Sequence, residues 1–300
     1  MNLTIKNSFI IVLLSLGSAT AITACCMSKQ QKYRTLRLTH NTPLVSISSE
    51  QNRRDSMEDR HLIDPEKSVF GVFDGHGGSE AVNHVTQTFN DQFKRNNDDL
   101  GQTLESIELD IKQKNIEMSG TTAIVAHIKD SKATIANIGD SRAILIRNNQ
   151  VLEKTVDHKP NLPSEKERIE KAGGKVFNTK YLILDHWRIG NEYINLSMSR
   201  ALGDHHLKEM PDFRGLIATP EISQWPLQKK DIIVLASDGV WDGIALNEPN
   251  EAVAKIIADT RTKKNLSDAA TLQQAAKMIS TQAKRKTLDN ITAMILYFDE

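Results

Sequence analysis

Cysteine is almost absent from the 300-residue chain, and this limits the chemistry of the rest. The only two cysteines, Cys25 and Cys26, are adjacent and lie near the N-terminus. The remaining residues therefore have neither a disulfide framework nor a thiolate metal site. Any metal ion bound there must use oxygen or imidazole ligands.

The chain also lacks an excess of charge of either sign, since 38 Lys and Arg residues balance 38 Asp and Glu residues. This balance argues against a nucleic-acid-binding protein, because such proteins carry a basic field. Internal repeats and low-complexity tracts are absent as well. No G-x-G-x-x-G pattern follows a predicted strand, which argues against a dinucleotide-binding half.

A long hydrophobic run is missing too. The strongly apolar segment Phe9 to Leu16 follows Lys6 and is short for a membrane span. We expect residues 1–26 to be an export signal, and "ITAC", Ile22 to Cys25, resembles the cleavage and lipidation box of bacterial lipoproteins, which would leave Cys25 as the lipid-bearing first residue. An uncleaved membrane anchor is the alternative. Both imply a membrane-associated or exported protein, with a linker over residues 27–49 and a soluble folded domain over residues 50–300.

Short apolar runs rich in Val, Ile and Ala predict strands. They are Val69–Phe73, Thr122–Ile128, Ala133–Ile138, Ala143–Ile146, Ile232–Ala236 and Ile291–Phe298. Several are joined by very short turns, which favours antiparallel pairing, because parallel strands need a longer crossover. Apolar spacings of three and four predict helices over Ala81–Phe93, Leu104–Ile116, Ser164–Ala172, Glu251–Ala258 and Ala269–Ala283. The predicted fold class is α+β, with two packed antiparallel β-sheets (a β-sandwich) flanked by helices.

The stretch "SVFGVFDGHGG", Ser68 to Gly78, places a carboxylate and an imidazole in a glycine-rich loop after an apolar run. The glycines can permit a tight turn. They can also let a backbone carbonyl approach a metal ion that Asp74 binds. A phosphate cradle is a third interpretation, but the glycine spacings of dinucleotide-binding and P-loop motifs are absent. This stretch alone does not decide between the turn and the metal site.

The pattern of Asp74 is repeated elsewhere. Asp140 in "TIANIGDS" and Asp238 in "IVLASDG" also end predicted strands, and Asp289 in "TLDNITAMIL" begins one. Because the start of one antiparallel strand lies beside the end of its neighbour, all four can converge on one edge. A single aspartate of this kind is typical of a turn. Converging carboxylates raise each other's pKa unless a cation neutralises them, and oxygen-only ligands select Mg²⁺ or Mn²⁺.

The charged segment "RRDSMEDR" offers further ligands. If residues 54–63 are extended, alternation places Arg54, Ser56 and Glu58 on one face and Met57 and Asp59 on the other. Glu58 would then reach the metal ions, and Arg54 would face an anion bound above them. A charged, solvated edge strand is the alternative interpretation.

Eight motifs, in order and at similar spacings, resemble the metal-dependent protein serine/threonine phosphatases of type 2C. They are Arg54-x-x-Met57-Glu58-Asp59, "VFDGHGG" at 72–78, "GTTA" at 120–123, "ANIGDSRA" at 136–143, "DHKP" at 157–160, "SRALGD" at 199–204, "ASDGVWD" at 236–242 and "DNIT" at 289–292. The resemblance spans about Arg54 to Tyr297. It implies two packed antiparallel sheets with a two-metal site at one end, and it makes residues 50–300 a phosphatase catalytic domain.

The resemblance also implies a set of metal ligands, with Mn²⁺ or Mg²⁺ as two core ions and a weaker third. The residues are Glu58, Asp59, Asp74, Gly75, Asp140, Asp238 and Asp289. Asp74 would bridge both core ions, Glu58 and the Gly75 carbonyl would complete one, and Asp238 and Asp289 the other. Asp59 would act through a metal-bound water. Asp140 would share the third position with Asp238.

The implied reaction is hydrolysis of phosphoserine and phosphothreonine by a metal-bridging hydroxide, with phosphoproteins as partners of a monomeric enzyme. Arg54 would bind the phosphate, whose oxygens suit a guanidinium. His76 resembles the proposed general acid, which protonates the leaving alkoxide. A binding or regulatory pseudophosphatase of the same fold is one alternative, disfavoured because every core ligand is present. A phosphatase of a non-protein phosphoester is the other.

The chain departs from the family pattern at three places. "KRKTLDN" precedes Asp289 without the Gly-Ser that the family often has there, so the local turn can differ. Gly243 replaces the usual apolar residue after "SDGVWD", and we expect it to loosen the following segment. Residues 204–218 correspond to a variable flap, so substrate choice is least transferable there.

Overall fold

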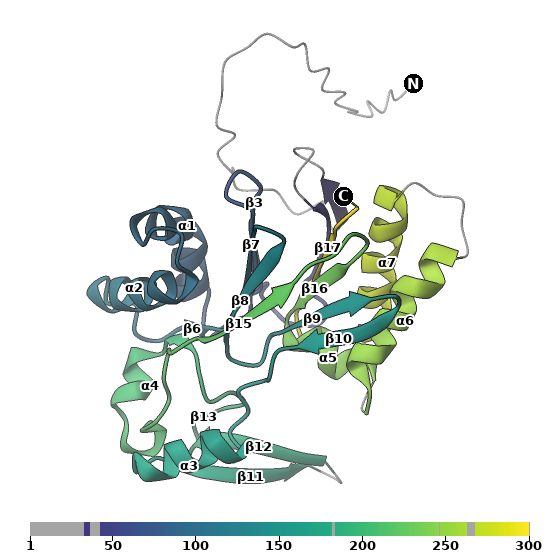
Figure 1. Cartoon of the computed structure of the whole chain (residues 1–300). Helices are drawn as coiled ribbons and strands as arrows, with labels where there is room; N and C mark the ends of the chain where they lie inside the picture. The colour runs from purple at the N-terminus through teal and green to yellow at the C-terminus, as the bar shows by residue number, and fades with distance from the viewer. Residues whose placement is uncertain (1–32, 37–42, 182–183, 246, 263–267, 300) are drawn as a thin grey trace, which may run out of the picture. The chain divides into compact units, whose positions relative to one another are not determined.

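Two antiparallel sheets form the centre of the protein (Figure 1). The computed structural model describes residues 33–36, 43–181, 184–245, 247–262 and 268–299, all of which belong to the unit Lys32–Glu300. The six-stranded sheet has the order β1 (Tyr33–Leu36), β2 (Leu44–Glu50), β17 (Ile291–Tyr297), β16 (Ile232–Ala236), β9 (Arg142–Arg147) and β10 (Gln150–Lys154). The five-stranded sheet has the order β15 (Glu221–Pro226), β8 (Lys132–Ile138), β7 (Ala123–Lys129), β4 (Val69–Phe73) and β3 (Arg60–Asp64).

Helices cover the outer face of each sheet (Figure 1). The five-stranded sheet packs against α1 (Glu80–Arg95) and α2 (Leu100–Gln113). The six-stranded sheet packs against α5 (Asp238–Ile244), α6 (Pro249–Thr262) and α7 (Asp268–Ala283). The predicted helix face of α7, marked by Leu272, Ala276, Ile279 and Ala283, is buried, which confirms its role in core packing.

Continuous apolar strands arise because both faces of the central strands are buried. In β16, Ile232, Val234 and Ala236 point toward the helices, while Ile233 and Leu235 point into the core between the two sheets. The same alternation occurs along β17 and β4. The predicted α+β fold of two packed antiparallel sheets flanked by helices is therefore confirmed.

A third part of the chain, residues 163–217, forms what we call the flap lobe, at the bottom of Figure 1. It contains α3 (Pro163–Lys171), β11 (Val176–Tyr181), β12 (Leu184–Gly190), β13 (Asn195–Leu196), β14 (Leu202–Gly203), α4 (His205–Glu209) and a 3₁₀ turn η1 (Pro211–Phe213). Strands β11, β12 and β13 form a small sheet, packed on a core of Ile169, Ile189, Phe213 and Leu216. Strand β14 pairs with β6 (Gly120–Thr121), which pairs with β5 (Gly75–His76), so the lobe joins the body through the glycine-rich loop.

The expectation of a linker over residues 27–49 is wrong for the part of that range that the structure describes. Tyr33–Leu36 and Leu44–Glu50 are the strands β1 and β2, and β2 lies between β1 and β17. Val45 and Ile47 are buried between the sheets, because the apolar residues of this strand alternate. The expected signal or anchor over residues 1–26, with Cys25, lies outside the described residues.

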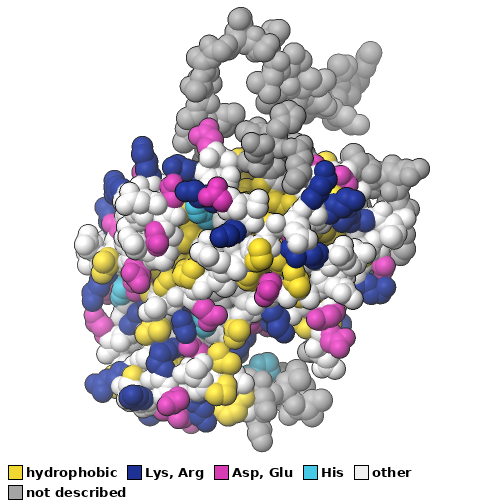
Figure 2. Space-filling model, in the orientation of Figure 1, with side chains coloured by type: hydrophobic (Ala, Val, Ile, Leu, Met, Phe, Trp, Pro, Cys, Tyr) yellow, Lys and Arg dark blue, Asp and Glu magenta, His cyan; other side chains and the backbone are white. Residues whose placement is uncertain are grey.

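Among the described residues, no helix combines the length and apolarity needed to cross a membrane. On the face shown in Figure 2, Lys and Arg side chains are interspersed with Asp and Glu side chains. Gly243, which we expect to loosen the following segment, lies buried in α5. A Cβ at this position would lie 2.7 Å from the Ala283 carbonyl oxygen, so the glycine lets α5 approach α7 closely.

Candidate active site

A pocket of about 400 Å³ lies where the acidic strand ends meet. Its lining includes predicted site residues from four separate motifs: Arg54, Glu58, Asp74, Gly75, His76, Asp238 and Asp289. Two further predicted residues, Asp59 and Asp140, are buried and do not line it. Both are nevertheless near enough to raise the pKa of Asp74. The convergence expected from antiparallel topology is therefore present, since β16 ends beside the start of β17, with Ala236 opposite Ala293.

Asp74 is fixed by the two threonines of "GTTA". The Asp74 N–H donates to Thr122 Oγ1 at 3.1 Å, and the Thr122 N–H donates to the Asp74 carbonyl at 2.9 Å. Thr121 Oγ1 donates to the same carbonyl at 3.1 Å. With its backbone held, Asp74 directs its carboxylate into the pocket.

Ser237 ties Asp238 to the neighbouring strand. Ser237 N–H donates to the Thr292 carbonyl at 3.0 Å, and Thr292 N–H donates to Ser237 Oγ at 3.0 Å. Ser237 Oγ also donates to Asp59 Oδ2 at 2.9 Å. Burial raises the pKa of Asp59 to about 6, although hydrogen bonds from Thr292 and Ser237 oppose this. Asp59 therefore lies next to Ser237, the residue that precedes Asp238.

The segment before β3 is not extended, so the predicted alternation from Arg54 is wrong. Residues 52–56 form a turn followed by bends, and the extended strand β3 begins only at Arg60. The side chain of Asn290 holds this turn by donating to the Gln51 and Ser56 carbonyls at 2.9 and 3.0 Å. The turn nevertheless leaves Arg54 and Glu58 in the pocket lining, as expected.

Gly75 is required for the close approach of two site segments. A Cβ at Gly75 would lie 2.7 Å from the Glu58 carbonyl oxygen, a distance that real Cβ atoms do not adopt. The Glu58 N–H in turn donates a hydrogen bond to Asn290 Oδ1 at 2.7 Å. The glycine therefore brings Glu58 beside the end of β4.

The donor set of the pocket fits a hard divalent cation. Its acidic side chains offer only carboxylate oxygens, and the buried Oδ1 atoms of Asp59 and Asp140 have no hydrogen-bond partner among the described residues. Burial, followed by the charge of Asp238, raises the pKa of Asp74 well above its ordinary value. Burial, followed by Asp140, does the same for Asp238. A bound cation would relieve this repulsion.

Within the described residues, no three His, Cys, Asp or Glu side chains already stand in a metal-binding arrangement. Two of the carboxylates are turned toward basic side chains instead. Arg54 Nη2 lies 2.7 Å from Asp289 Oδ2, and Lys159 Nζ lies 2.5 Å from Asp140 Oδ2. Arg54 was expected to face a phosphate. In this structure its guanidinium faces the Asp289 carboxylate.

The "DHKP" motif fastens the loop that carries Asp140. His158 exchanges two hydrogen bonds with Gly139: its N–H donates to the Gly139 carbonyl at 2.9 Å, and its Nδ1 accepts from the Gly139 N–H at 3.1 Å. Lys159, which follows His158, and Asp140, which follows Gly139, form an ion pair. Asp140 is thereby held facing Lys159, behind the pocket.

His76 has a partner that the sequence motifs did not reveal. Its Nε2 lies 2.8 Å from Oδ2 of the buried Asp204, and its Nδ1 has no partner among the described residues. Burial lowers the pKa of His76, but the charge and hydrogen bond of Asp204, together with the charges of Asp140 and Glu58, raise it by more, so the pKa is raised overall. Because an ionised carboxylate only accepts, we assign a proton to Nε2. The "SRALGD" motif contains Asp204, but only the fold places it beside His76.

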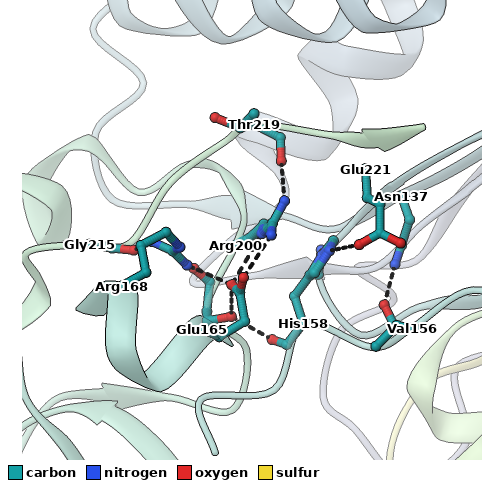
Figure 3. A network of polar contacts seen from close by, with 11 residues as sticks. Asn137, Val156, His158, Glu165, Arg168, Arg200, Gly215, Thr219 and Glu221 are labelled. Atoms are coloured by element: carbon teal, nitrogen blue, oxygen red, sulfur yellow. Dashed lines mark hydrogen bonds and ion pairs between the residues drawn. The ribbon is translucent and has the colours of Figure 1, made fainter. Parts of the chain in front are cut away.

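The flap lobe supplies one wall of the pocket, which the sequence motifs also did not reveal. The wall residues are Arg188, Asn195, Leu196, Ser197 and Met198. The flap lobe is therefore larger than the expected residues 204–218. Besides the pairing of β14 with β6, polar contacts join the lobe to the body: Ser199 Oγ donates to the His158 carbonyl, and Arg200 Nη1 donates to the Thr219 carbonyl, within the network drawn in Figure 3.

Comparisons with known proteins agree with this geometry. The family model described as Protein phosphatase 2C matches residues 44–291. Protein phosphatase 1L of Bos taurus is 33% identical over 288 residues, covering 86% of this chain and 72% of the relative. Protein phosphatase 2C 1 of Paramecium tetraurelia is 31% identical over 304 residues, covering 90% and 98%.

The fold is also similar to a crystal structure of serine-threonine phosphatase 2C from Toxoplasma gondii. The TM-score is 0.68 at 22% identity, over 89% of this chain and 99% of that one. The family match covers most of the chain and includes the motifs that build the pocket. The chain therefore belongs to the protein phosphatase 2C family and is a protein serine/threonine phosphatase.

Proposed function

We propose that this phosphatase hydrolyses phosphoserine and phosphothreonine esters with the help of Mn²⁺ or Mg²⁺ held in the pocket. The observation that carries the proposal is the convergence of Glu58, Asp74, Asp238 and Asp289 beside a basic side chain and an imidazole. Carboxylates with raised pKa values are suited to bind divalent cations, because a cation removes the cost of their mutual repulsion.

Two core ions would be held by the acidic residues that line the pocket, and Asp74 would be shared by the two sites. Glu58 and the Gly75 carbonyl would complete one site, and Asp238 and Asp289 the other. Asp59 would act through a water, and Asp140 would contribute with Asp238 to a weaker third position. When bound, such ions lower the pKa of water, which supplies the attacking hydroxide, and neutralise phosphoryl oxygens.

Arg54 can exchange the Asp289 carboxylate, its partner in this structure, for the phosphoryl group of a substrate. Its side chain is 58% exposed, and its guanidinium donates to Asp289, whose oxygens a cation would also use. A phosphoryl group would offer Arg54 two acceptor oxygens for its guanidinium. Arg54 would then orient the substrate and share its negative charge.

His76 would supply the proton that the serine or threonine alkoxide needs on leaving. Asp204 orients the ring through Nε2 and favours the protonated imidazole. In that state Nδ1, the nitrogen without a partner among the described residues, also carries a proton. Such a group acts as a general acid near neutral pH.

The test is turnover by the full-length chain of matched phosphoserine, phosphothreonine and phosphotyrosine peptides with Mn²⁺, Mg²⁺ or EDTA. We expect metal-dependent hydrolysis of the first two, and a loss of at least a hundred-fold in Asp74→Asn and Asp238→Asn. Asp91→Asn is the control, because Asp91 is exposed on α1, away from the pocket. Turnover in EDTA, or activity that survives both substitutions, would refute the metal mechanism. Metal binding without any turnover would favour a regulatory pseudophosphatase.

We also propose that the N-terminus attaches the enzyme to a membrane through lipid on Cys25. The support is the "ITAC" pattern after a short apolar segment. Growth with a radiolabelled fatty acid should label the wild-type protein, and Cys25→Ser should abolish the label. Equal labelling of Cys25→Ser would contradict lipidation at this residue.

A further inference from the structure

The loop that carries Asp204, the partner of His76, has an unusual backbone. Gly203 and Asp204 have φ values of 78° and 54°, in the left-handed region. Glycine adopts this region at no steric cost, but a residue with a side chain does so rarely, where neighbouring groups hold it. Because Asp204 Oδ2 lies 2.8 Å from His76 Nε2, the groups that hold this loop also set the position of the imidazole.

A carboxylate of α2 holds this loop. The Gly203 N–H donates to Glu108 Oε2 at 2.7 Å, and Lys208 Nζ donates to Glu108 Oε1 at 2.6 Å. The two oxygens of Glu108 thus bind groups that precede and follow Asp204 in the sequence. The Glu108 and Lys208 side chains are 16% and 15% exposed, so water screens their ion pair only in part. Hydrogen bonds to a carboxylate are also about twice as strong as those between neutral groups.

Two other carboxylates of the same helix lie elsewhere. Asp110 Oδ2 lies 2.7 Å from His84 Nε2 of α1, so this pair joins the two helices of one layer. Glu105 is exposed and has no hydrogen-bond or ion-pair partner within the described part of the chain. Glu108 belongs to none of the eight sequence motifs and does not line the pocket. The role of Glu108 therefore follows from its contacts with the Asp204 loop.

We propose that Glu108 is a positioning residue for proton transfer to the leaving group. By fixing Gly203, it keeps Asp204 in the left-handed conformation that directs the Asp204 carboxylate to His76. The proposal rests on the proposed function, in which His76 protonates the serine or threonine alkoxide. Because Glu108 lies outside the pocket lining, its loss should slow the chemical step for poor leaving groups without weakening substrate binding.

The test compares Glu108→Ala and Glu108→Gln with wild type in the full-length protein with Mn²⁺. The substrates are a phosphothreonine peptide, whose alkoxide leaving group needs a proton, and p-nitrophenyl phosphate, whose leaving group needs little protonation. Glu105→Ala is the matched control, because it removes an exposed carboxylate one helical turn away on α2. Glu108→Gln keeps an acceptor oxygen for the Gly203 N–H but loses the charge that attracts Lys208. Thermal unfolding verifies that each variant is folded.

We expect Glu108→Ala to lower kcat for the phosphothreonine peptide about ten-fold, in keeping with the loss of a charge-assisted hydrogen bond. The effect should be smaller than that of Asp204→Asn, because the Asp204 N–H still donates to the Ser119 carbonyl at 3.0 Å. KM for both substrates and kcat for the aryl phosphate should change less than about two-fold. Glu108→Gln should lose about three-fold on the peptide, so this variant decides the question if Glu108→Ala does not fold. Equal loss of kcat for both substrates, a change in KM alone, or no change would overturn the proposal.

A double variant separates positioning from a general structural effect. If Glu108 acts through Asp204, the double variant Glu108→Ala with Asp204→Asn should hydrolyse the phosphothreonine peptide no more slowly than Asp204→Asn alone. Losses that multiply would mean that Glu108 acts independently of Asp204, and would overturn the proposal.

The proposed function is tested separately by His76→Ala. If this variant slows both substrates equally, or wild type hydrolyses neither, the proposed role of His76 fails while the positioning is still measured, by NMR of the His76 ring with Mg²⁺ in place of paramagnetic Mn²⁺. The ring signals are assigned by their absence in His76→Ala. At fixed pH they should shift in Glu108→Ala as they do in Asp204→Asn, and stay unchanged in Glu105→Ala. Identical ring signals in Glu108→Ala and wild type would overturn the positioning.

Discussion

Replacing Glu165 should cost more stability than replacing any exposed carboxylate, because Glu165 is the buried acceptor shared by three side chains of the flap lobe. Its side chain is 2% exposed. Arg200 Nη2 donates to Oε1 at 2.6 Å, and Arg168 Nη2 and Ser199 Oγ each donate to Oε2 at 2.5 Å (Figure 3). Removing this carboxylate leaves two guanidinium groups without their shared partner.

Two lines of reasoning give the magnitude. Breaking a buried ion pair by removal of one partner costs about 3–5 kcal/mol. Burial alone would raise the pKa of Glu165, but hydrogen bonds from Arg200, Arg168 and Ser199 lower it from 4.5 to about 2. At about 1.4 kcal/mol per pKa unit this corresponds to about 3 kcal/mol, an upper bound because Arg168 is 27% exposed and therefore partly screened.

The pH dependence has a defined sign. A carboxylate whose pKa is lower in the folded than in the unfolded state binds fewer protons when folded, so its contribution is complete above the unfolded pKa. The contribution of Glu165 should be present above about pH 5 and be lost progressively toward pH 2. Glu165→Gln, which keeps the shape without the charge, should lack this component.

Urea unfolding at pH 7 and at intervals down to the acid transition measures both effects. We expect Glu165→Ala to lose about 3 kcal/mol at pH 7, and its difference from wild type to shrink as the pH falls. Glu170→Ala is the matched control on α3, because Glu170 is 53% exposed and should change stability by less than about 0.5 kcal/mol. A loss below about 1 kcal/mol in Glu165→Ala, or a difference independent of pH between 5 and 2, would refute the reasoning.

Three further predictions concern the core, the Asp238 loop and His76. Phe89→Ala should destabilise the protein by about 3–5 kcal/mol in urea unfolding, because the ring is fully buried and lies 6.2 and 5.9 Å from the rings of Phe73 and Phe93; a loss under about 1 kcal/mol would contradict that packing. Gly239→Ala should weaken Mn²⁺ binding in calorimetry at least ten-fold, since its Cβ would lie 2.0 Å from the Asn290 carbonyl oxygen and displace the adjacent Asp238; an unchanged isotherm would be incompatible with this account. Asp204→Asn, like His76→Ala, should slow a phosphothreonine peptide more than an aryl phosphate, whose leaving group needs little protonation; equal slowing would argue against the orientation of His76 by Asp204.

The central strands and long helices could be predicted from the sequence because they are buried over most of their length. Val69–Phe73 and Ile232–Ala236 are found with the predicted bounds, since an apolar run that faces both a sheet and a helix layer has a clear signal. By contrast, β2 has a weaker signal, because Ser46 and Ser48 interrupt it although both are buried. The β11 and β12 hairpin mixes polar and charged residues with apolar ones and gives no such signal.

The acidic half of the site could be predicted because topology makes strand ends meet. The aspartates can be recognised in the sequence because each one ends or precedes an apolar run. Of the predicted ligands, only Asp59 and Asp140 do not line the pocket. The partners of the basic and imidazole groups could not be predicted in this way. Asp204 reaches His76 only because β14 pairs with β6 and β6 with β5, and such long-range pairing leaves no local pattern.

The most direct test of the central claim is calorimetric titration of Mn²⁺ into the wild-type protein and into Asp74→Asn, with Asp91→Asn as the control. The account predicts that wild type and Asp91→Asn bind two ions at the core sites, and that Asp74→Asn loses at least one of them together with phosphothreonine hydrolysis. Identical isotherms for wild type and Asp74→Asn would contradict the claim that the pocket carboxylates hold the metal ions on which hydrolysis depends.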